Sequence, residues 1–95
     1  MYLAKVTGNV VSTVKNKHLV GFKLLLVKPI DLQGNVKDEN EIICIDLVDA
    51  GIGDNVIVVD EGDAVQQILG HDKAPVNVMI IGVVDNIEIQ DIIKE

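Results

Sequence analysis

The residues of this chain that could do chemistry are concentrated in one acidic stretch that contains glycine. Residues 50–62 read AGIGDNVIVVDEG and place two glycines beside an aspartate. A glycine-rich turn can cradle a phosphate when a helix follows it. The G-x-G-x-x-G fingerprint needs a third glycine where Val56 stands, no Gly-Lys-Ser/Thr is present, and the following segment is typical of a strand. The pattern therefore favours a tight turn in which Gly51 or Gly53 has a positive φ.

Carboxylates are dense around this stretch, and paired carboxylates can transfer protons or hold a metal ion. The acidic set comprises Asp46, Asp49, Asp54, Asp60, Glu61 and Asp63. No spacing among them defines a catalytic geometry. We interpret Asp54 as an acceptor for the amides of the turn, and Asp63 as a residue near the start of a short helix.

The other reactive side chains are isolated along the chain. Cys44, the only cysteine, lies between isoleucines in a strand-like segment, where a small buried hydrophobe is typical. His18 and His71 lie in expected turns, and no third residue completes a site with them. The oxygen-rich segment 31–41 lacks the glycine and glutamate that a calcium loop requires. The sequence thus proposes no catalytic, cofactor or metal site, and we expect a protein that is not an enzyme.

The charge balance argues against nucleic acid as a partner. The net charge is −7, and all eight cationic side chains other than histidine are lysines. Nucleic-acid binding favours a basic face, guanidinium groups and stacking aromatics, and aromatics are only 2% of this chain. No apolar run approaches the roughly 20 residues of a membrane span, and the first residues do not have the pattern of a signal peptide. We expect a soluble, cytoplasmic protein.

The elements that position these residues are expected to be mainly strands. Hydrophobic residues make up 48% of the chain and are largely valine and isoleucine, which favour pleated strands. Glycines at positions 8 and 82 lie inside apolar runs and indicate bulges. One short helix is expected at 62–69, where apolar residues have helical spacing and Gly70 can cap the end. The predicted strands are 3–14, 22–28, 42–48, 56–60, 76–85 and 86–93.

Five to six short strands and one short helix predict a mainly β fold, a small closed OB-like or Greek-key β-barrel. We expect residues 1–95 to form a single domain, with 86–95 as a C-terminal strand or tail. A domain of this size buries only about 60–65% of the surface of its unfolded chain. The aliphatic content exceeds what one small core can hide, so some apolar residues are expected to contact another subunit.

Three segments match the pattern of one known family in order and spacing. They are LAKVTGNVVSTVKN near the start, D-x-V-D-A-G-I-G-D-x-V-I-V in the centre, and APVNVMIIGVVDNIEI near the end. From Met1 to about Ile89 the chain therefore resembles the EutN/CcmL family of bacterial microcompartment vertex proteins. The resemblance implies a small β-barrel that forms a homopentamer and closes the fivefold corners of a cytoplasmic shell, alongside hexameric shell proteins.

The resemblance also implies which residues form the family motif and what they do. The family's glycine-glycine-aspartate loop corresponds to Gly51, Gly53 and Asp54, and its late glycine and aspartate correspond to Gly82 and Asp85. Their implied role is structural. The chain departs from the family at 61–65, where an acidic EGDAV replaces the usual glycine, two serines, alanine and arginine.

A second reading of the residues stays open at this point. A small OB-like module that binds a ligand as a monomer or dimer would need a concave site with converging polar groups. The candidate residues for such a site are Lys15, Lys17, Lys23 and Lys28.

Overall fold

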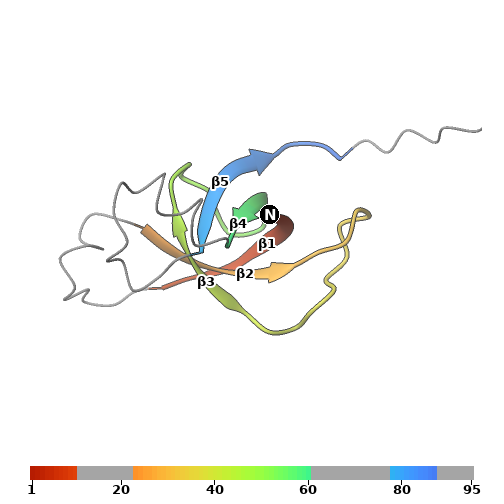
Figure 1. The fold of residues 1–95 in the computed structure, drawn as a ribbon, viewed down its shortest axis with the longest axis horizontal. Coiled ribbons are helices and arrows are strands. Elements are labelled where there is room, and N and C mark those ends of the chain that lie inside the picture. The colour runs from red at the N-terminus through yellow and green to blue at the C-terminus, as the bar shows by residue number, and fades with distance from the viewer. Residues whose placement is uncertain (11–22, 61–77, 88–95) are drawn as a thin grey trace, which may run out of the picture.

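The computed structural model describes residues 1–10, 23–60 and 78–87, and these residues form five strands. The strands are β1 (Tyr2–Asn9), β2 (Lys23–Pro29), β3 (Ile42–Asp46), β4 (Asn55–Val59) and β5 (Met79–Val84). They close into one barrel in the order β1-β2-β3-β5-β4, with β4 paired back to β1 (Figure 1). Only the β3–β5 pair among these is parallel. The predicted small closed barrel is confirmed.

The strand boundaries differ from the prediction mainly where side chains redirect the backbone. β3 was predicted to continue to Val48 but ends at Asp46, because the Asp46 carboxylate accepts a hydrogen bond from the Val48 amide and bends the chain. Asn86 and Ile87 are not in a strand, so the predicted last strand does not begin at 86. The rest of that strand, the end of the first one (11–14) and the expected helix at 62–69 lie outside the described residues. The described part of the chain contains no helix that could cross a membrane.

The core is filled by inward-facing side chains from all five strands. These side chains are aliphatic or small, as a narrow barrel requires, and the partly buried Tyr2 packs against them. The cluster consists of Ala4, Val6, Leu25, Val27, Cys44, Ala50, Val56, Val58 and Ile80. Because neighbours along a strand point to opposite faces, Leu3 and Lys5 on β1 and Ile57 on β4, which alternate with core residues, lie on the outer face of the barrel.

Two bulges bend the strands at the glycines where the sequence predicts them. Val6 pairs with Val27 and Gly8 with Leu26, so Thr7 has no partner of its own on β2. On β5, Ile57 pairs with Gly82 and Val58 with Ile80, which leaves Ile81 unmatched. Bulges increase local bending and twist, and thereby help a short sheet to close on itself.

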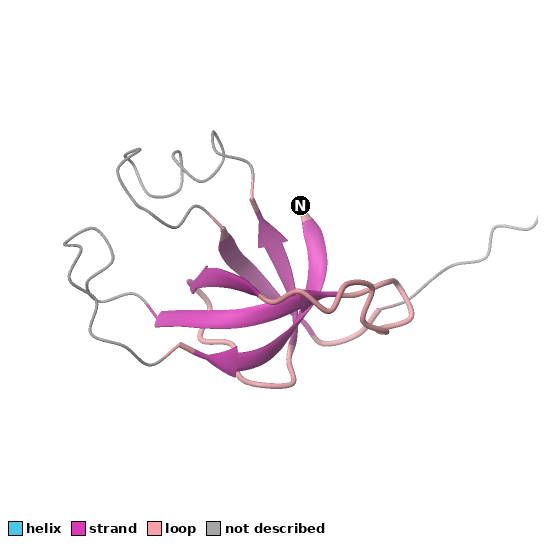
Figure 2. Cartoon of the chain, turned by 90° about the horizontal axis from the view of Figure 1, so that it is seen from below, coloured by secondary structure: helices cyan, strands magenta, loops and turns pink. Residues whose placement is uncertain are grey.

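The connection between β2 and β3 is an exposed loop that projects from the barrel (Figure 2). One oxygen of Asp31 accepts hydrogen bonds from the amides of Gln33 and Asn35, each at 2.9 Å. Gly34 has a φ of 87°, and Ile30 forms an isolated bridge with Val36. The loop is therefore folded by Asp31, and its hydrophobic residue Leu32 is left at the surface.

Candidate functional site: the acidic corner and the outer face of the barrel

The glycine-glycine-aspartate stretch forms a tight turn that is closed by its own aspartate. The Asp54 amide donates to the Gly51 carbonyl at 3.0 Å, and the Asp54 carboxylate accepts from the Gly51 amide at 2.8 Å. Gly53 has a φ of 93°, as the third position of a type II turn requires. The Gly53 amide also donates to Val6 at 2.8 Å, and the Val6 amide to Asp54 at 2.9 Å. These bonds fasten the turn to β1, and they leave no cradle of free amides for a phosphate.

A second corner, one turn earlier, is organised by the buried carboxylate of Asp46. The side chain is fully buried, and its two oxygens accept separately from the amides of Val48 (3.0 Å) and Ala50 (2.8 Å). Lys23 lies 3.5 Å from this carboxylate and donates to the Ala50 carbonyl at 2.7 Å and to Asp49 at 3.1 Å. The hydrogen bond to Asp49 raises the pKa of Lys23 above its ordinary value. This corner ties the loop before the turn to the start of β2.

Three carboxylates of the acidic set, those of Asp46, Asp49 and Asp54, are thus engaged in holding the two corners together. Asp46 and Asp54 accept amide hydrogen bonds, and Asp49 pairs with Lys23. Among the residues in 1–10, 23–60 and 78–87, no group of three or more His, Cys, Asp or Glu side chains is placed to hold a metal ion. Glu61, Asp63, His18 and His71 lie outside the described residues.

Two ionisable groups that pack in or against the described core, the buried Cys44 thiol and the partly buried Tyr2 hydroxyl, keep their protons. Cys44 is buried, and desolvation, with a smaller repulsion from Asp60, raises the pKa of its thiol to about 12. Desolvation, with smaller contributions from Cys44 and Asp60, raises the pKa of the Tyr2 hydroxyl to about 12. A thiol with such a pKa is almost entirely protonated near neutral pH, so Cys44 is not an activated nucleophile.

These two pKa shifts predict a loss of stability in alkali. The folded state holds both protons more tightly than the unfolded chain, whose groups ionise from their ordinary pKa values of 9.0 and 10.0. The contribution of these two groups to the free energy of unfolding is therefore fully present below about pH 9. It is expected to be lost progressively as the pH rises toward 12. The urea midpoint, measured in steps from about pH 8 to pH 11, checks this. Cys44→Ala and Tyr2→Phe should each make the decline shallower, and a midpoint that stays flat in the unaltered protein would contradict the assignment.

The lysines of the alternative ligand site do not form one described group. Lys23 belongs to the corner above, while Lys28, near the other end of β2, pairs with Glu39 at 3.0 Å, which raises the pKa of Lys28. Lys15 and Lys17 lie outside the described residues. Both described lysines are therefore already bound to carboxylates of the chain.

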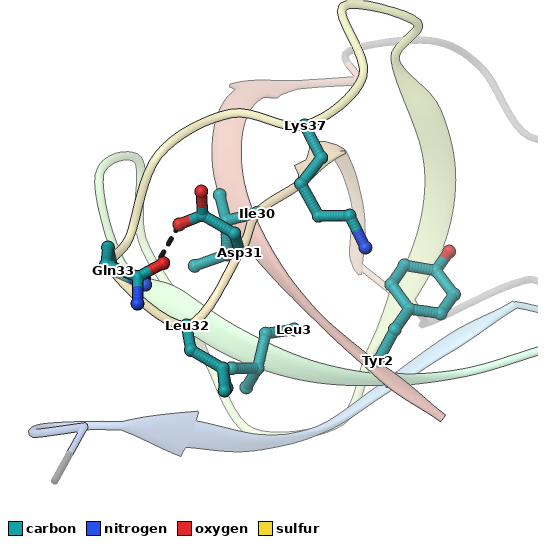
Figure 3. A pocket seen from close by; sticks show the side chains of 7 residues that line it. All are labelled: Tyr2, Leu3, Ile30, Asp31, Leu32, Gln33 and Lys37. Carbon is teal, nitrogen blue, oxygen red and sulfur yellow. Dashed lines mark hydrogen bonds between the residues drawn. The ribbon is translucent and has the colours of Figure 1, made fainter. Parts of the chain in front are cut away.

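Two shallow hollows lie on the outside of the barrel and share the side chains of Leu32 and Gln33. The first has a volume of about 480 Å³ and is bounded by Leu3, Ile30 and Leu32 on its apolar side and by Lys37 on its polar side (Figure 3). The second, of about 530 Å³, runs past Gly34 to Asn55, Asp85 and Ile87. The surface between the β2–β3 loop and the strands is therefore grooved and partly apolar.

The comparisons with known proteins agree with this architecture. The family model described as "Ethanolamine utilisation protein EutN/carboxysome" matches residues 1–85. The chain belongs to the EutN/CcmL family. The carboxysome shell vertex protein CcmL of Nostoc sp. is 37% identical over 91 residues, which cover 96% of this chain and 89% of the relative. The microcompartment shell vertex protein EutN of Salmonella typhimurium is 40% identical over 87 residues, covering 92% and 86%.

Solved structures of EutN/CcmL proteins have the same barrel. An ethanolamine utilization protein EutN superposes with a TM-score of 0.78 at 40% identity, covering 90% of this chain and 86% of the other. GrpN, a pentameric microcompartment shell protein from Rhodospirillum rubrum, superposes with a TM-score of 0.78 at 37% identity, covering 95% and 100%. The similarity thus extends over nearly the whole of both chains.

Four of the five residues expected to form the EutN/CcmL motif (Gly51, Gly53, Asp54 and Asp85) lie near one end of the β4–β5 pair, and Gly82 lies opposite Ile57 in the middle of β4. Asn55 follows Asp54 and pairs with Val84, which precedes Asp85. Asn55 and Asp85 line the same hollow, and the Asn55 side-chain oxygen is buried without a hydrogen-bond partner in the described structure. Gly82 occupies the bulge, where an added Cβ would lie 3.6 Å from Ile57. The turn and the late strand are therefore adjacent in space, although some 30 residues separate them in this EutN/CcmL chain.

Sequence reasoning missed the pairing of Asp46 with Lys23 and the hollow between Leu3 and Leu32. Asp46 belonged to the acidic set without a distinct role, because an aspartate after an apolar run also fits an exposed turn. Lys23 is a candidate for the ligand patch in the sequence, and nothing in the sequence indicates that it lies beside a residue 23 positions later. Both features depend on how the strands pair, and no local signal could have revealed them.

Proposed function

We propose that this chain assembles into a homopentamer that closes the fivefold vertices of a bacterial microcompartment shell in the cytoplasm. The observation that carries the proposal is the match over residues 1–85 to a family whose relatives, 37% and 40% identical here, are named shell vertex proteins. In this role the chain forms one domain, and its neighbours in the shell are hexameric shell proteins. It works without a cofactor and binds neither nucleic acid nor membrane.

The barrel surface supports an assembling protein. Large aliphatic side chains are exposed at several points of the described structure, among them Leu32, Ile43, Leu47 and Ile81. Exposed apolar residues that are neighbours, such as Leu47 and Ile81, mark interaction sites in soluble proteins. A ring of more than two identical subunits needs two different contact surfaces on each subunit, so apolar residues on more than one side of the barrel fit a pentamer better than a monomer.

The chemistry of the described side chains supports a structural role over an enzymatic one. Asp46 and Asp54 are acceptors for backbone amides, and Cys44 is buried and protonated. We propose that the motif residues Gly51, Gly53, Asp54, Gly82 and Asp85 fix the geometry at the end of β4 and β5. Their substitution should change folding or assembly and no catalytic turnover.

The oligomeric state tests the proposal most directly. Native mass spectrometry and light scattering of the purified chain at about 10–200 µM subunit are expected to show a pentamer, since assembly follows mass action. A species that stays monomeric or dimeric over this range would contradict the vertex role. It would instead favour the small ligand-binding module.

Salt should strengthen the pentamer. Each subunit carries a net charge of −7, so five subunits repel one another while their apolar surfaces attract. The Debye length falls from roughly 10 Å at 0.1 M salt to about 3 Å at 1 M, which screens the repulsion and leaves burial intact. We expect the subunit concentration at half-assembly to fall several-fold between about 50 mM and 500 mM NaCl, as measured by sedimentation velocity. Dissociation by salt would instead show that ion pairs hold the ring together.

A further inference from the structure

Apolar side chains on the outside of the barrel form one band across three neighbouring strands. Leu3 on β1 pairs with Ile57 on β4, and Ile57 pairs with Gly82 on β5. The residues next to Leu3 and Ile57 along their strands belong to the core, so these two side chains face outward. Residues opposite each other in a sheet share a face, so Leu3, Ile57 and Gly82 form one row from β1 to β5, to which Gly82 contributes backbone but no side chain.

The band continues to the end of β3 at one side. The Leu47 amide donates to the Ile80 carbonyl at 3.3 Å, which extends the parallel β3–β5 pairing and sets Leu47 beside Ile81. Ile81 is the unmatched residue of the β5 bulge and is 36% exposed, and Leu47 is 40% exposed. Gly82 adds no side chain beyond them. This end of the band, which we call the ridge (Leu47 and Ile81), carries two neighbouring exposed aliphatic side chains.

At its other side the band ends in the first hollow. Leu3 lies there with Leu32, which is 55% exposed, while Ile30 forms a buried wall (Figure 3). Asp31 also lines this hollow, but one of its oxygens already accepts two amides of its own loop. We call this end the groove (Leu3, Ile30 and Leu32). Its volume of about 480 Å³ is large enough for aliphatic side chains of a neighbour, and it is too open to enclose a small molecule.

We propose that the ridge of one subunit packs into the groove of the next, so that the two ends of one band form the contact that closes the ring. The inference rests on the proposed pentamer and names the surfaces that build it. Head-to-tail closure requires two different, complementary patches on each subunit, and the band supplies an exposed aliphatic end and a hollowed end on different strands. A second copy of this chain is the occupant that fits, because every copy carries both ends, both ends are mainly apolar, and the relative GrpN is a pentameric shell protein.

Two single substitutions test the proposal after the unaltered chain has been shown to form a pentamer. Ile81→Glu breaks the ridge and Leu32→Glu breaks the groove, each by placing a charge where apolar surface is buried. Ile52→Glu is the matched control, because Ile52 is 63% exposed at the tip of the turn and lies outside the band. We expect both band variants to be folded monomers at about 50 µM by circular dichroism and sedimentation velocity, and the control to remain pentameric.

Mixing the two band variants gives the sharper result. Ile81→Glu keeps an intact groove and Leu32→Glu an intact ridge, so one subunit of each can join through a single native contact. We expect native mass spectrometry of the mixture to show 1:1 heterodimers that do not grow further. The proposal is overturned if either variant alone remains a pentamer, or if the mixture stays monomeric at concentrations up to about 500 µM.

The outcomes separate this inference from the proposed function. An unaltered chain that forms no pentamer removes the vertex role itself. A pentamer that survives both band substitutions keeps the vertex role and shows that other surfaces close the ring. Variants that stay pentameric but fail to assemble with hexameric shell proteins would assign the band to that partner, and would equally overturn the proposed ring contact.

Discussion

Asp46→Ala is expected to lower the free energy of unfolding by about 2–5 kcal/mol, because it leaves two backbone amides without their acceptor at roughly 1–3 kcal/mol each. The substitution deletes a fully buried carboxylate whose two oxygens satisfy the amides of Val48 and Ala50. Both amides would then lack their acceptor at the corner where the chain leaves β3. Lys23 is partly exposed and can turn to solvent, so the loss comes mainly from the two amides and the collapsed corner.

The matched control is Asp49→Asn, three residues later, because Asp49 has a φ of 58° that asparagine tolerates and alanine does not. Asp49 pairs with the same lysine at 3.1 Å, but its side chain is 95% exposed, so the loss of its charge should cost less than about 1 kcal/mol. Asp46→Asn should be nearly as harmful as alanine. Each carboxylate oxygen serves a different amide, and the asparagine NH₂ group would face one of those donors. Urea unfolding of the three variants at one pH and salt concentration gives the comparison, and equal losses for Asp46 and Asp49 would refute the buried role.

The contrast between the two corners shows what the sequence could and could not predict. The turn at Gly51 to Asp54 is local: a glycine at the position that needs positive φ and an aspartate three residues after the first glycine are readable from spacing alone. The corner at Asp46 needs Lys23 from another strand, and only the β2–β3 register brings them together. Sequence patterns of short range therefore predicted the first feature and not the second.

The same reasoning applies to the strands and the surface. Apolar runs separated by turn residues predicted the five described strands and the closed barrel, because burial in a small β fold leaves few other arrangements. The bulges were predictable from glycines inside those runs. The groove was not, because Leu3 and Leu32 meet only when the β2–β3 loop folds back over β1. An excess of aliphatic residues predicted an outward apolar surface, yet only strand pairing shows which residues form it.

The described structure also distinguishes residues that stabilise the fold of the subunit from residues proposed to form the contact between subunits. Residues of the same type occur in both groups. Leu25 and Leu32 are both leucines on or beside β2, seven positions apart. Leu25 is fully buried in the core, whereas Leu32 is 55% exposed at the groove. Residue type alone does not distinguish these two leucines. Substituting each of them by alanine measures separately what each contributes to folding and to assembly.

Leu25→Ala is expected to lower the free energy of unfolding of the subunit by about 2–5 kcal/mol, since it opens a cavity in a close-packed core. Leu32→Ala should change it by less than about 1 kcal/mol, because the side chain is already largely in water. Both are measured by urea unfolding at low salt and low micromolar concentration, where dissociated subunits remove the contribution of assembly. The order should reverse for assembly: Leu32→Ala should raise the half-assembly concentration about tenfold or more, as loss of a central interface contact does, while folded Leu25→Ala retains the unaltered value. If Leu32→Ala destabilised the isolated subunit as much as Leu25→Ala, Leu32 would be part of the core that stabilises the fold. That result would contradict the proposal that Leu32 mainly stabilises the contact between subunits.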